Sequence, residues 1–545
     1  MYFPLTEEQQ NWADSVLSSM TMEEKVLQLI HPNDREYTES EWIELIEKYP
    51  VGSFFSTPRN FEETKQINRV VQKHSRIPVL VSADMENGTN FIKDYTLEFP
   101  AQMGLAASNV SDAAYKMGRI TAKLSRAAGI HWTFSPVIDL NINPENPITN
   151  IRALGDDPEK IIPLFNEIIR GLQEQDLMAA ACKHFPGDGV DDRDQHMLVS
   201  VNSLPFDQWM ELYGRVWKAA ISAGTKTIMC GHISLPDYQG MADDIDNALP
   251  ATLSRKLMND LLRKELGFRG VIVSDAFPMI GFTCRYPEEE LAWRNIEEGS
   301  DSVLFSHPER DFKPMMDALK AGKLSEERVE TSARRIIELK ASLNLFKDPF
   351  GDDFNPGEFE QCKNVIEEVS NKSVTVLRQA KLGQLPVSPE KHPKVLTVSL
   401  IRHNNKLPNC ELELVDKELK ARGFEVDHLT NPTDKQLLDA LKVYDRIFIN
   451  LTTQNHGGMQ LRLAGKPALA FWHSFFTHAP EKVVYTSFGS PYVLYDHPFF
   501  ENCTCVWGCY QACQRSAVKY WCGEIQADGV LPVRPHKTKI KRWEF

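Results

Sequence analysis

The sequence contains no run of about 18 apolar residues, the length that an α-helix needs to cross a bilayer, so we expect no membrane-spanning helix. Residues 1–11 carry neither a basic nor an apolar stretch, which argues against a secretory signal peptide. Basic residues are also scarce, because 61 Lys and Arg stand against 75 Asp and Glu and give a net charge of -14. This balance argues against nucleic-acid and anionic-membrane partners. We expect a cytoplasmic protein.

The ten cysteines lack the paired C-x-x-C spacing of a zinc site. Five of them gather near the end of the chain with no histidine among them, at Cys503, Cys505, Cys509, Cys513 and Cys522. Zinc binding by this group is an alternative, but free thiols in the core fit the spacing and the compartment better. We expect no metal and no cofactor.

Length and composition indicate more than one domain with a sizeable core, since the chain has 545 residues of which 42% are hydrophobic. Before residue 310, apolar runs alternate with amphipathic stretches, which is typical of a parallel sheet covered by helices on both faces. Strands are predicted at 51–55, 78–83, 130–138, 177–182, 225–230, 270–274 and 301–305. We predict an α/β fold whose residues 1–350 form a (β/α)8-type TIM barrel, irregular or one strand short.

Helices of this barrel are predicted from the 3.6-residue period and from capping residues. Thr6 can cap the first helix, which we extend over residues 6–30. The others are predicted at 41–49, 61–74, 110–128, 158–175, 206–223, 254–266, 288–299 and 311–345, the last being most strongly periodic over 325–345.

A loop-like stretch at 347–356 marks the end of the barrel. We assign 351–393 to a connecting helix near 358–378 and a proline-containing linker. Short strands between helices are then predicted at 395–401, 424–428, 446–451, 467–472 and 483–488. Residues 394–545 are therefore predicted to form an α/β three-layer sandwich domain.

One loop carries an unusual density of charge. The apolar run 177–182 reads as a buried strand that ends on Lys183 and His184, and a proline and two glycines then break regular structure. Several aspartates, an arginine and His196 follow. A solvated surface loop is the simple alternative, but catalytic residues collect on loops at strand ends.

Polar residues recur at the carboxyl ends of the predicted strands. They are Asp84, Asp139, Lys183, His184, His232 and Asp275. In a (β/α)8 barrel this end is the active face, so their recurrence predicts a catalytic centre there.

Asp275 and the pair formed by Asp194 and His196 suit nucleophilic catalysis. Asp275 follows an apolar strand, and a carboxylate held as the anion can attack an electrophilic carbon. Asp194 lies two residues from His196, so on a bent loop it can orient the imidazole and stabilise its protonated form. His196 could then give a proton to a leaving oxygen and later take one from water. Double-displacement glycoside hydrolysis requires this combination.

These motifs resemble family 3 glycoside hydrolases of the β-N-acetylglucosaminidase (β-N-acetylhexosaminidase) type. Residues 183–187 (K-H-F-P-G) with Asp194-x-His196 are similar to the catalytic loop of that family, and 273–279 (V-S-D-A-x-x-M) to its nucleophile strand. The chain is similar to the sugar-binding signatures of the family at 84–86, 136–139, 143–144 and 152–155. It also resembles, at 250–254, the segment that precedes the nucleophile strand of the family. The resemblance covers about the first 345 residues, and 487–492 and 529–533 resemble more weakly the C-terminal domain of two-domain members.

The resemblance implies roles for individual residues. Asp275 would be the nucleophile, His196 the acid/base and Asp194 the partner of His196. The substrate-binding residues would be Asp84, Arg152, Lys183, His184 and Met279.

Several positions depart from the family pattern. Asp188 replaces the histidine after Pro-Gly, Gln195 replaces the serine of D-S-H, and Asn87 replaces a glycine. None of these changes removes a catalytic group, but together they bear on the choice of leaving group.

Each candidate also has a structural interpretation. Asp275 could merely cap the next helix, and His196 could be an exposed loop residue. His184 and His232 could be structural, and Trp132 and Trp293 are expected in the core. The aspartates at 188, 191 and 192 are expected to be solvated.

The leading hypothesis is a retaining exo-β-N-acetylglucosaminidase, monomeric or homodimeric, that acts on small saccharides such as cell-wall or chitin fragments. An alternative keeps the site but uses phosphate in place of water, because a neutral histidine repels an anion less than a carboxylate does. A metal-dependent barrel hydrolase with His184, Asp194 and His196 as ligands is a further class, but the first strand lacks an H-x-H pair. The last class is a non-catalytic sugar-binding protein, which the intact nucleophile and proton-donor motifs oppose.

Overall fold

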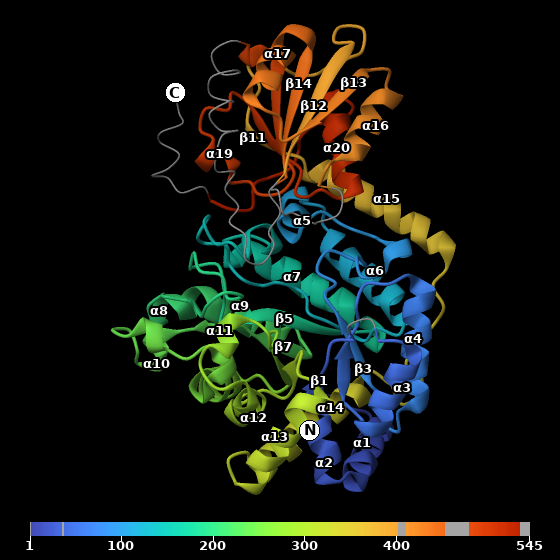
Figure 1. Cartoon of the computed structure of the whole chain (residues 1–545), viewed down its shortest axis with the longest axis vertical. Helices are drawn as coiled ribbons and strands as arrows, with labels where there is room; N and C mark the ends of the chain where they lie inside the picture. Colours follow the sequence, from blue (N-terminus) through green and yellow to red (C-terminus); the bar gives the residue numbers. More distant parts are fainter. Residues whose placement is uncertain (1, 35–36, 402–409, 453–478, 535–545) are drawn as a thin grey trace. The chain divides into compact units, whose positions relative to one another are not determined.

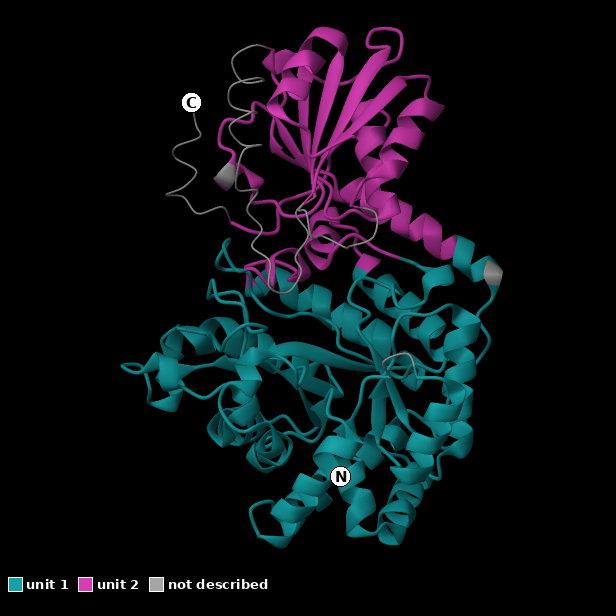
Figure 2. Cartoon of the chain, in the orientation of Figure 1, with its two compact units in different colours: residues 1–97, 114–146, 158–360 teal, residues 98–113, 147–157, 361–545 magenta. Residues whose placement is uncertain are grey.

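The computed structural model describes residues 2–34, 37–401, 410–452 and 479–534. The chain divides into two compact units, coloured separately in Figure 2. Unit 1 comprises 1–97, 114–146 and 158–360, and unit 2 comprises 98–113, 147–157 and 361–545. Two segments from within the predicted barrel sequence therefore group with the C-terminal residues.

Unit 1 is the predicted TIM barrel. Its largest sheet is entirely parallel and follows chain order, with strands β2 (Ser53–Phe55), β3 (Leu80–Ala83), β4 (Trp132–Thr133), β5 (Ala179–Phe185), β7 (Thr227–Cys230) and β9 (Val271–Ser274). A parallel pair, β1 (Ile30–His31) and β10 (Val303–Leu304), continues this order. Isolated parallel bridges from Asn33 to Phe55 and from Val273 to Ser302 join the pair to both edges of the sheet. Parallel pairing thus passes through all eight of these strands, of which β1, β3, β5 and β7 are labelled in Figure 1.

Strand β1 lies where the sequence predicted the end of one long helix. That prediction was wrong, because a second capping box interrupts residues 6–30. Helix α1 (Glu7–Ser19) ends, Thr21 accepts a hydrogen bond from the Glu24 amide, and the short helix α2 (Met22–Leu27) begins. Leu29, Ile30 and His31, all buried, are then available for the barrel, which gains the strand that the sequence analysis missed.

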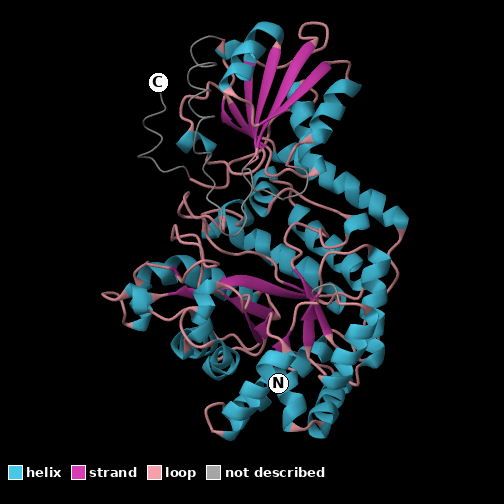
Figure 3. Ribbon diagram, in the orientation of Figure 1, coloured by secondary structure: helices cyan, strands magenta, loops and turns pink. Residues whose placement is uncertain are grey.

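The other helices of unit 1 lie close to the predicted ranges, and Figure 3 draws the helices in cyan. They include α3 (Glu39–Lys48), α4 (Phe61–His74), α6 (Ala113–Ala127), α7 (Pro158–Gln173), α9 (Arg215–Ser222), α12 (Glu288–Glu298), α13 (Pro308–Lys320) and α14 (Glu326–Ser342). The helix predicted at 254–266 is a π-helix over Lys256–Glu265. Helix α14 packs Ala333, Ile337 and Ala341 against Ala13 and Leu17 of α1.

The interior of the barrel is filled by alternate strand residues, since positions i and i+2 of a strand face the same side. Phe55, Leu80, Trp132, Ala179, Ala181, Met229, Val271 and Val273 form one buried cluster. The Trp132 indole donates a hydrogen bond of 2.8 Å to Thr227 Oγ1. This tryptophan is therefore a core residue, as predicted.

Unit 2 contains a six-stranded sheet in the order β11-β16-β15-β14-β12-β13. Strands β12 (Lys394–Leu400), β13 (Glu425–Thr430), β14 (Arg446–Leu451) and β15 (Val483–Ser487) match predicted strands, and the strand predicted at 467–472 lies outside the described residues. The sequence analysis missed β11 (Thr375–Arg378), which the predicted connecting helix covered, and β16 (Cys503–Cys505). Helix α15 (Pro356–Ser373) in fact ends before β11.

Helices cover both faces of the unit 2 sheet. Helices α16 (Glu413–Ala421) and α20 (Gln511–Trp521) contribute Val415, Leu419 and Trp521 to a core with Val395 and Phe448. On the other face, α17 (Asp434–Val443) packs Leu437 and Ala440 on Leu396, Val398 and Ile449. Alternate residues of β12 thus point into different cores, which confirms the three-layer sandwich.

All ten cysteines are free thiols. Eight are buried, but Cys284 is exposed and Cys522 is half-buried, so the core prediction was wrong for these two. No helix among the described residues is both long and apolar enough to cross a membrane.

Candidate active site

Lys183 joins the ends of two strands. It lies on β5, and its Nζ is 2.9 Å from Asp84 Oδ1 and 2.7 Å from Glu86 Oε1, both on the loop after β3. The lysine side chain is only 4% exposed, whereas that of Asp84 is 41% exposed. The buried cation therefore fixes a carboxylate that remains accessible. Glu86 is not among the predicted site residues, although it lies within the segment 84–86 that resembles a sugar-binding signature.

His184 is oriented by a buried carboxylate. Its Nδ1 lies 2.7 Å from Asp139 Oδ2, and its backbone amide donates to both oxygens of the same carboxylate at 3.2 Å. Asp139 is fully buried after β4. Because Nδ1 is held in this way, Nε2 is the ring nitrogen through which His184 can bind a substrate.

Asp188 is buried, which contradicts the prediction that it is solvated. Its amide donates to Asp139 Oδ1 at 2.7 Å, and its carboxylate accepts from the Gly189 amide at 2.7 Å and from Asn146 Nδ2 at 2.8 Å. Burial, together with the nearby Asp139 charge, raises the pKa of Asp188 to about 6. Asp191 is half-buried and accepts a hydrogen bond from the Val201 amide. Of the aspartates at 188, 191 and 192 that were predicted to be solvated, only Asp192 is exposed.

Gln195 links this buried carboxylate to the next strand. Its Nε2 donates to Asp188 Oδ2 at 3.4 Å, and its Oε1 accepts the His232 amide at 2.9 Å. Gln195 is 1% exposed. The two positions at which the loop departs most from the family pattern, 188 and 195, are therefore in contact. Together they attach the loop to the carboxyl end of β7.

Asp194 and His196 form the pair that the sequence predicted. The carboxylate Oδ1 lies 2.7 Å from His196 Nδ1 and also accepts the His196 amide at 2.9 Å. Asp194 is buried, whereas the His196 side chain is 42% exposed. The carboxylate can therefore orient the ring and stabilise its protonated form while the imidazole stays accessible to a substrate.

Asp275 follows β9 on the same end of the barrel. Its amide donates to Cys230 O at 2.8 Å, and its Oδ1 accepts the Ala276 amide at 2.8 Å. Burial alone would raise the pKa of Asp275, but the imidazoles of His184, His232 and His196 outweigh it and hold the pKa below its ordinary value. The side chain stays half-buried and ionised, which suits a nucleophile.

His232 supports the loop that carries Asp275. Its Nδ1 lies 2.9 Å from Thr252 Oγ1, its Nε2 lies 3.1 Å from Ala276 O, and the ring stacks on Phe282 at 5.0 Å. Burial lowers the pKa of His232 to about 4. Both ring nitrogens face protein atoms, so the residue holds the backbone beside Asp275.

Met279 and Arg152 lie in different parts of the structure. Met279 is buried at the start of helix α11 (Ile280–Thr283), where the next amide, that of Ile280, donates to His196 O at 3.0 Å. Arg152 lies on segment 147–157, which groups with unit 2, and its Nη1 donates to Ile148 O at 3.2 Å. The other predicted site residues all belong to unit 1.

A metal-ligand arrangement was one of the alternatives for this loop. Across the described parts of the chain, no three His, Cys, Asp or Glu side chains are placed to hold a metal ion. His184 contacts Asp139, and His196 contacts Asp194, in carboxylate–imidazole pairs.

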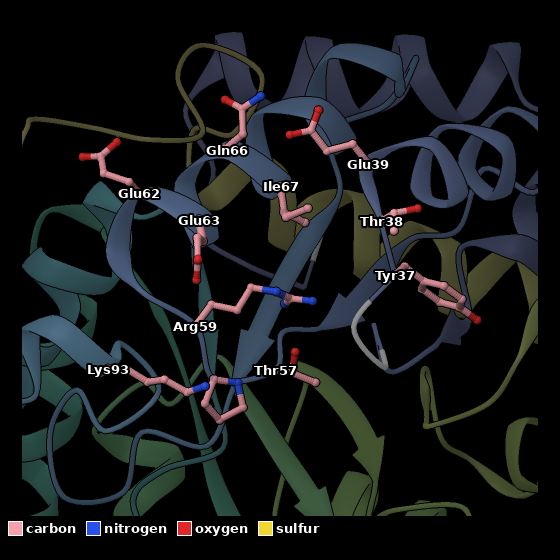
Figure 4. A pocket seen from close by; sticks show the side chains of 11 residues that line it. Tyr37, Thr38, Glu39, Thr57, Arg59, Glu62, Glu63, Gln66, Ile67 and Lys93 are labelled. Carbon is pink, nitrogen blue, oxygen red and sulfur yellow. The ribbon is translucent and has the colours of Figure 1, made fainter.

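A pocket of about 650 Å³ opens at the same end of the barrel, beyond strands β1 to β3. Figure 4 shows its lining, with Arg59 between β2 and α4, Lys93 at the start of a short 3-10 helix (Lys93–Tyr95), and Glu62, Glu63 and Gln66 on α4. The Arg59 guanidinium pairs with the buried carboxylate of Asp34. Since the lining holds charges of both signs, it indicates no particular ligand.

Comparisons with known proteins agree with this geometry. The N-terminal domain family "Glycosyl hydrolase family 3" matches residues 21–339. A β-N-acetylglucosaminidase/β-glucosidase of Cellulomonas fimi is 31% identical over 529 residues, which cover 91% of this chain and 90% of that protein.

Two solved structures share the whole architecture. A β-glucoside phosphorylase, BglX, has a TM-score of 0.87 at 30% identity and covers 98% of this chain and 97% of its own. A family 3 β-N-acetylglucosaminidase from Paenibacillus sp. str. FPU-7 has a TM-score of 0.83 at 24% identity, covers 95% of this chain and 99% of its own, and supports the fold. The chain therefore belongs to glycosyl hydrolase family 3 and is a glycoside hydrolase.

Proposed function

We propose that the chain is a retaining exo-β-N-acetylglucosaminidase that removes terminal β-linked GlcNAc through a covalent glycosyl-aspartate intermediate. The observation that carries the proposal is the placement of an ionised, half-buried Asp275 among imidazoles, one of which, His196, lies 2.7 Å from its own carboxylate partner. The Cellulomonas fimi relative, which is named for GlcNAc and glucose substrates, supports the choice of sugar.

In the first step, a carboxylate oxygen of Asp275 attacks the anomeric carbon, and the bond from that carbon to the leaving oxygen breaks. The protonated His196 gives its proton to the leaving oxygen, and Asp194 stabilises the imidazolium. In the second step, neutral His196 takes a proton from water, which attacks the anomeric carbon and releases Asp275. Two inversions at the same carbon give a product with retained configuration.

Sugar binding is assigned to the residues around this centre. Asp84 and Lys183 can bind hydroxyl groups as acceptor and donor, and Nε2 of His184 can form a hydrogen bond with a hydroxyl group while Asp139 holds Nδ1. The resemblance adds Met279.

A second candidate function uses phosphate as the acceptor. The similarity to a β-glucoside phosphorylase, at 30% identity over 98% of this chain, favours it. The acid/base is also a histidine that is neutral when the acceptor enters, so an anion meets less repulsion than it would from a carboxylate. Phosphate would then replace water in the second step and give a sugar 1-phosphate.

The test is to incubate the enzyme with p-nitrophenyl β-glycosides of GlcNAc and of glucose, each with and without phosphate. Proton NMR of the first-formed product reads both its anomeric configuration and its chemical identity. Free β-GlcNAc as the first product supports the hydrolase, whereas a sugar 1-phosphate supports the phosphorylase. An α-configured free sugar would contradict the retaining mechanism.

A further inference from the structure

Exposed aliphatic side chains gather beside the proposed acid/base. Among the described residues of unit 1, the large apolar side chains with high exposure are Met197 at 54%, Ile280 at 43%, Leu198 at 40% and Ile245 at 37%. Met197 and Leu198 directly follow His196, and Ile280 directly follows Met279. Exposed apolar groups that cluster in one place mark binding surfaces, whereas isolated ones are ordinary.

Backbone contacts bring these segments together. The Ile280 amide donates to His196 O at 3.0 Å, and a Cβ built on Gly281 would lie 2.8 Å from Leu198 O. The loop that carries the acid/base and the loop that follows Asp275 are therefore in direct contact.

The loop bearing Ile245 is tied to the same region by ion pairs and hydrogen bonds. Arg193 Nη1 is 3.3 Å from Asp246 Oδ1, and Arg285 Nη2 donates to Asp246 O at 2.6 Å. The segment that carries Ile245 therefore contacts the acid/base loop through its neighbour Asp246.

We infer that Met197, Leu198 and Ile280, with Ile245 at their edge, form a binding surface for an apolar leaving group. This inference rests on the proposed function, because a general acid must lie within hydrogen-bond reach of the leaving oxygen. Whatever is attached to that oxygen must then cover the residues next to His196. These residues are aliphatic, so the substrate class is an alkyl or aryl β-glycoside.

The kind of side chain distinguishes this class from an oligosaccharide. A second sugar in the leaving-group position presents hydroxyl groups and is usually bound by polar side chains and by flat aromatic faces. No Phe or Trp of the described chain is among the exposed large apolar residues. Methionine and leucine adapt instead to flexible hydrocarbon.

The experiment compares kcat/KM for methyl, butyl, hexyl and octyl β-glycosides of the preferred sugar. The leaving alcohols have nearly equal acidity, so the series changes apolar area alone. We expect kcat/KM to rise roughly two- to fourfold per added methylene, the factor that half to full burial of a methylene provides. The combined variant Met197→Gln, Leu198→Gln and Ile280→Gln should show a nearly flat series. Leu438→Gln on α17, where the leucine is 40% exposed, is the matched control and should keep the rise.

Each outcome can be read separately. A flat series in the wild type, with the methyl glycoside still cleaved, overturns the inference and leaves the proposed function standing. If no glycoside is cleaved, the proposed function fails, and calorimetry with the corresponding alkyl 1-thioglycosides decides the inference by the same dependence on chain length. The inference is also overturned if kcat/KM of the triple variant still rises with alkyl chain length. It is overturned as well if the triple substitution changes the association state measured by sedimentation, because the surface would then be a contact between copies of the chain.

Discussion

The two ends of the barrel in unit 1 each hold a carboxylate, half-buried Asp275 at one end and fully buried Asp301 at the other, and the neighbours of the two differ. At the carboxyl end, the imidazoles of His184, His232 and His196 act on Asp275 electrostatically, and its Oδ1 accepts one backbone hydrogen bond. At the amino end, Asp301 accepts hydrogen bonds from Arg263 at 2.6 Å, Arg328 at 2.7 Å and Arg335 at 2.9 Å. Asp301 also accepts from Ser332 Oγ and from the Ile272 amide.

Both carboxylates have a lowered pKa, yet only one can react. Burial raises the pKa of each, and at Asp301 the guanidinium groups of Arg335, Arg263 and Arg328 outweigh it. Asp301 is fully buried with its oxygens saturated, whereas Asp275 keeps accessible surface. A lowered pKa therefore does not identify a nucleophile, and accessibility beside a proton donor is the distinguishing property.

The largest expected effect is on turnover. Asp275→Asn should lower kcat by about 10⁴-fold or more, because the amide cannot form the glycosyl ester. The melting temperature should change by no more than about 4 °C, the shift that about 1 kcal/mol produces. Steady-state kinetics and calorimetry measure the two quantities. Asp192→Asn, an exposed carboxylate on the catalytic loop, is the control, and a loss of less than tenfold in Asp275→Asn would refute the assignment.

The acid/base should show an effect that depends on the leaving group. His196→Asn should reduce kcat/KM by about 10²–10⁴-fold for alkyl glycosides, which need protonation of the leaving oxygen. The reduction should be much smaller for 2,4-dinitrophenyl glycosides, whose leaving groups depart unprotonated. Asp194→Asn should show the same pattern with smaller losses. Equal losses across the leaving-group series would indicate a structural role for His196.

At the amino end the effect should fall on stability. Asp301→Asn leaves three guanidinium groups without their counter-charge and should lower the free energy of unfolding of unit 1 by about 3–5 kcal/mol. The kcat of the folded protein should stay within about twofold of wild type. Urea unfolding measures the first quantity. Asp317→Asn, whose partner Lys313 is also exposed, should move the midpoint little. An unchanged midpoint in Asp301→Asn would mean that the arginine cluster contributes nothing to stability.

The smallest effect is the pH dependence contributed by His232. Its folded pKa of about 4 lies below the ordinary value of 6.5, so the unfolded chain binds the proton more tightly. The contribution of neutral His232 to the free energy of unfolding is fully present above pH 6.5 and is lost as the pH falls toward 4. It amounts to about 2 kcal/mol between pH 6.5 and 5, at about 1.4 kcal/mol per unit. Urea unfolding at both pH values should show this slope reduced in His232→Gln, and equal slopes would contradict the assignment.

Strong periodicity and strand-end chemistry made much of the fold and the site predictable from sequence. The helix predicted at 61–74 is α4 without a change in bounds, and continuous apolar runs marked β3, β5, β7 and β9. The Asp194–His196 contact followed from a spacing of two residues on a bent loop, because such neighbours can meet without any long-range constraint.

Features that depend on distant partners could not be predicted. Strand β1 holds only two residues, and it exists because β10 pairs with it across most of the barrel sequence. Asp188 looks solvated beside other aspartates, but Asn146 and Gln195 bury it. The grouping of 147–157 with unit 2 also arises from contacts with residues far along the chain, such as Arg534 with Asp156.

The central claim is that Asp275 forms a covalent bond to the sugar. The direct test is to incubate the enzyme with 5-fluoro-β-N-acetylglucosaminyl fluoride or 2-deoxy-2-fluoro-β-glucosyl fluoride, then digest it and map the label by mass spectrometry. We predict a single glycosyl adduct on the peptide that contains Asp275, absent in Asp275→Asn. A label on another carboxylate would contradict the account. So would unlabelled enzyme that still releases a product of retained configuration, because the acetamido group of the substrate would then be the nucleophile.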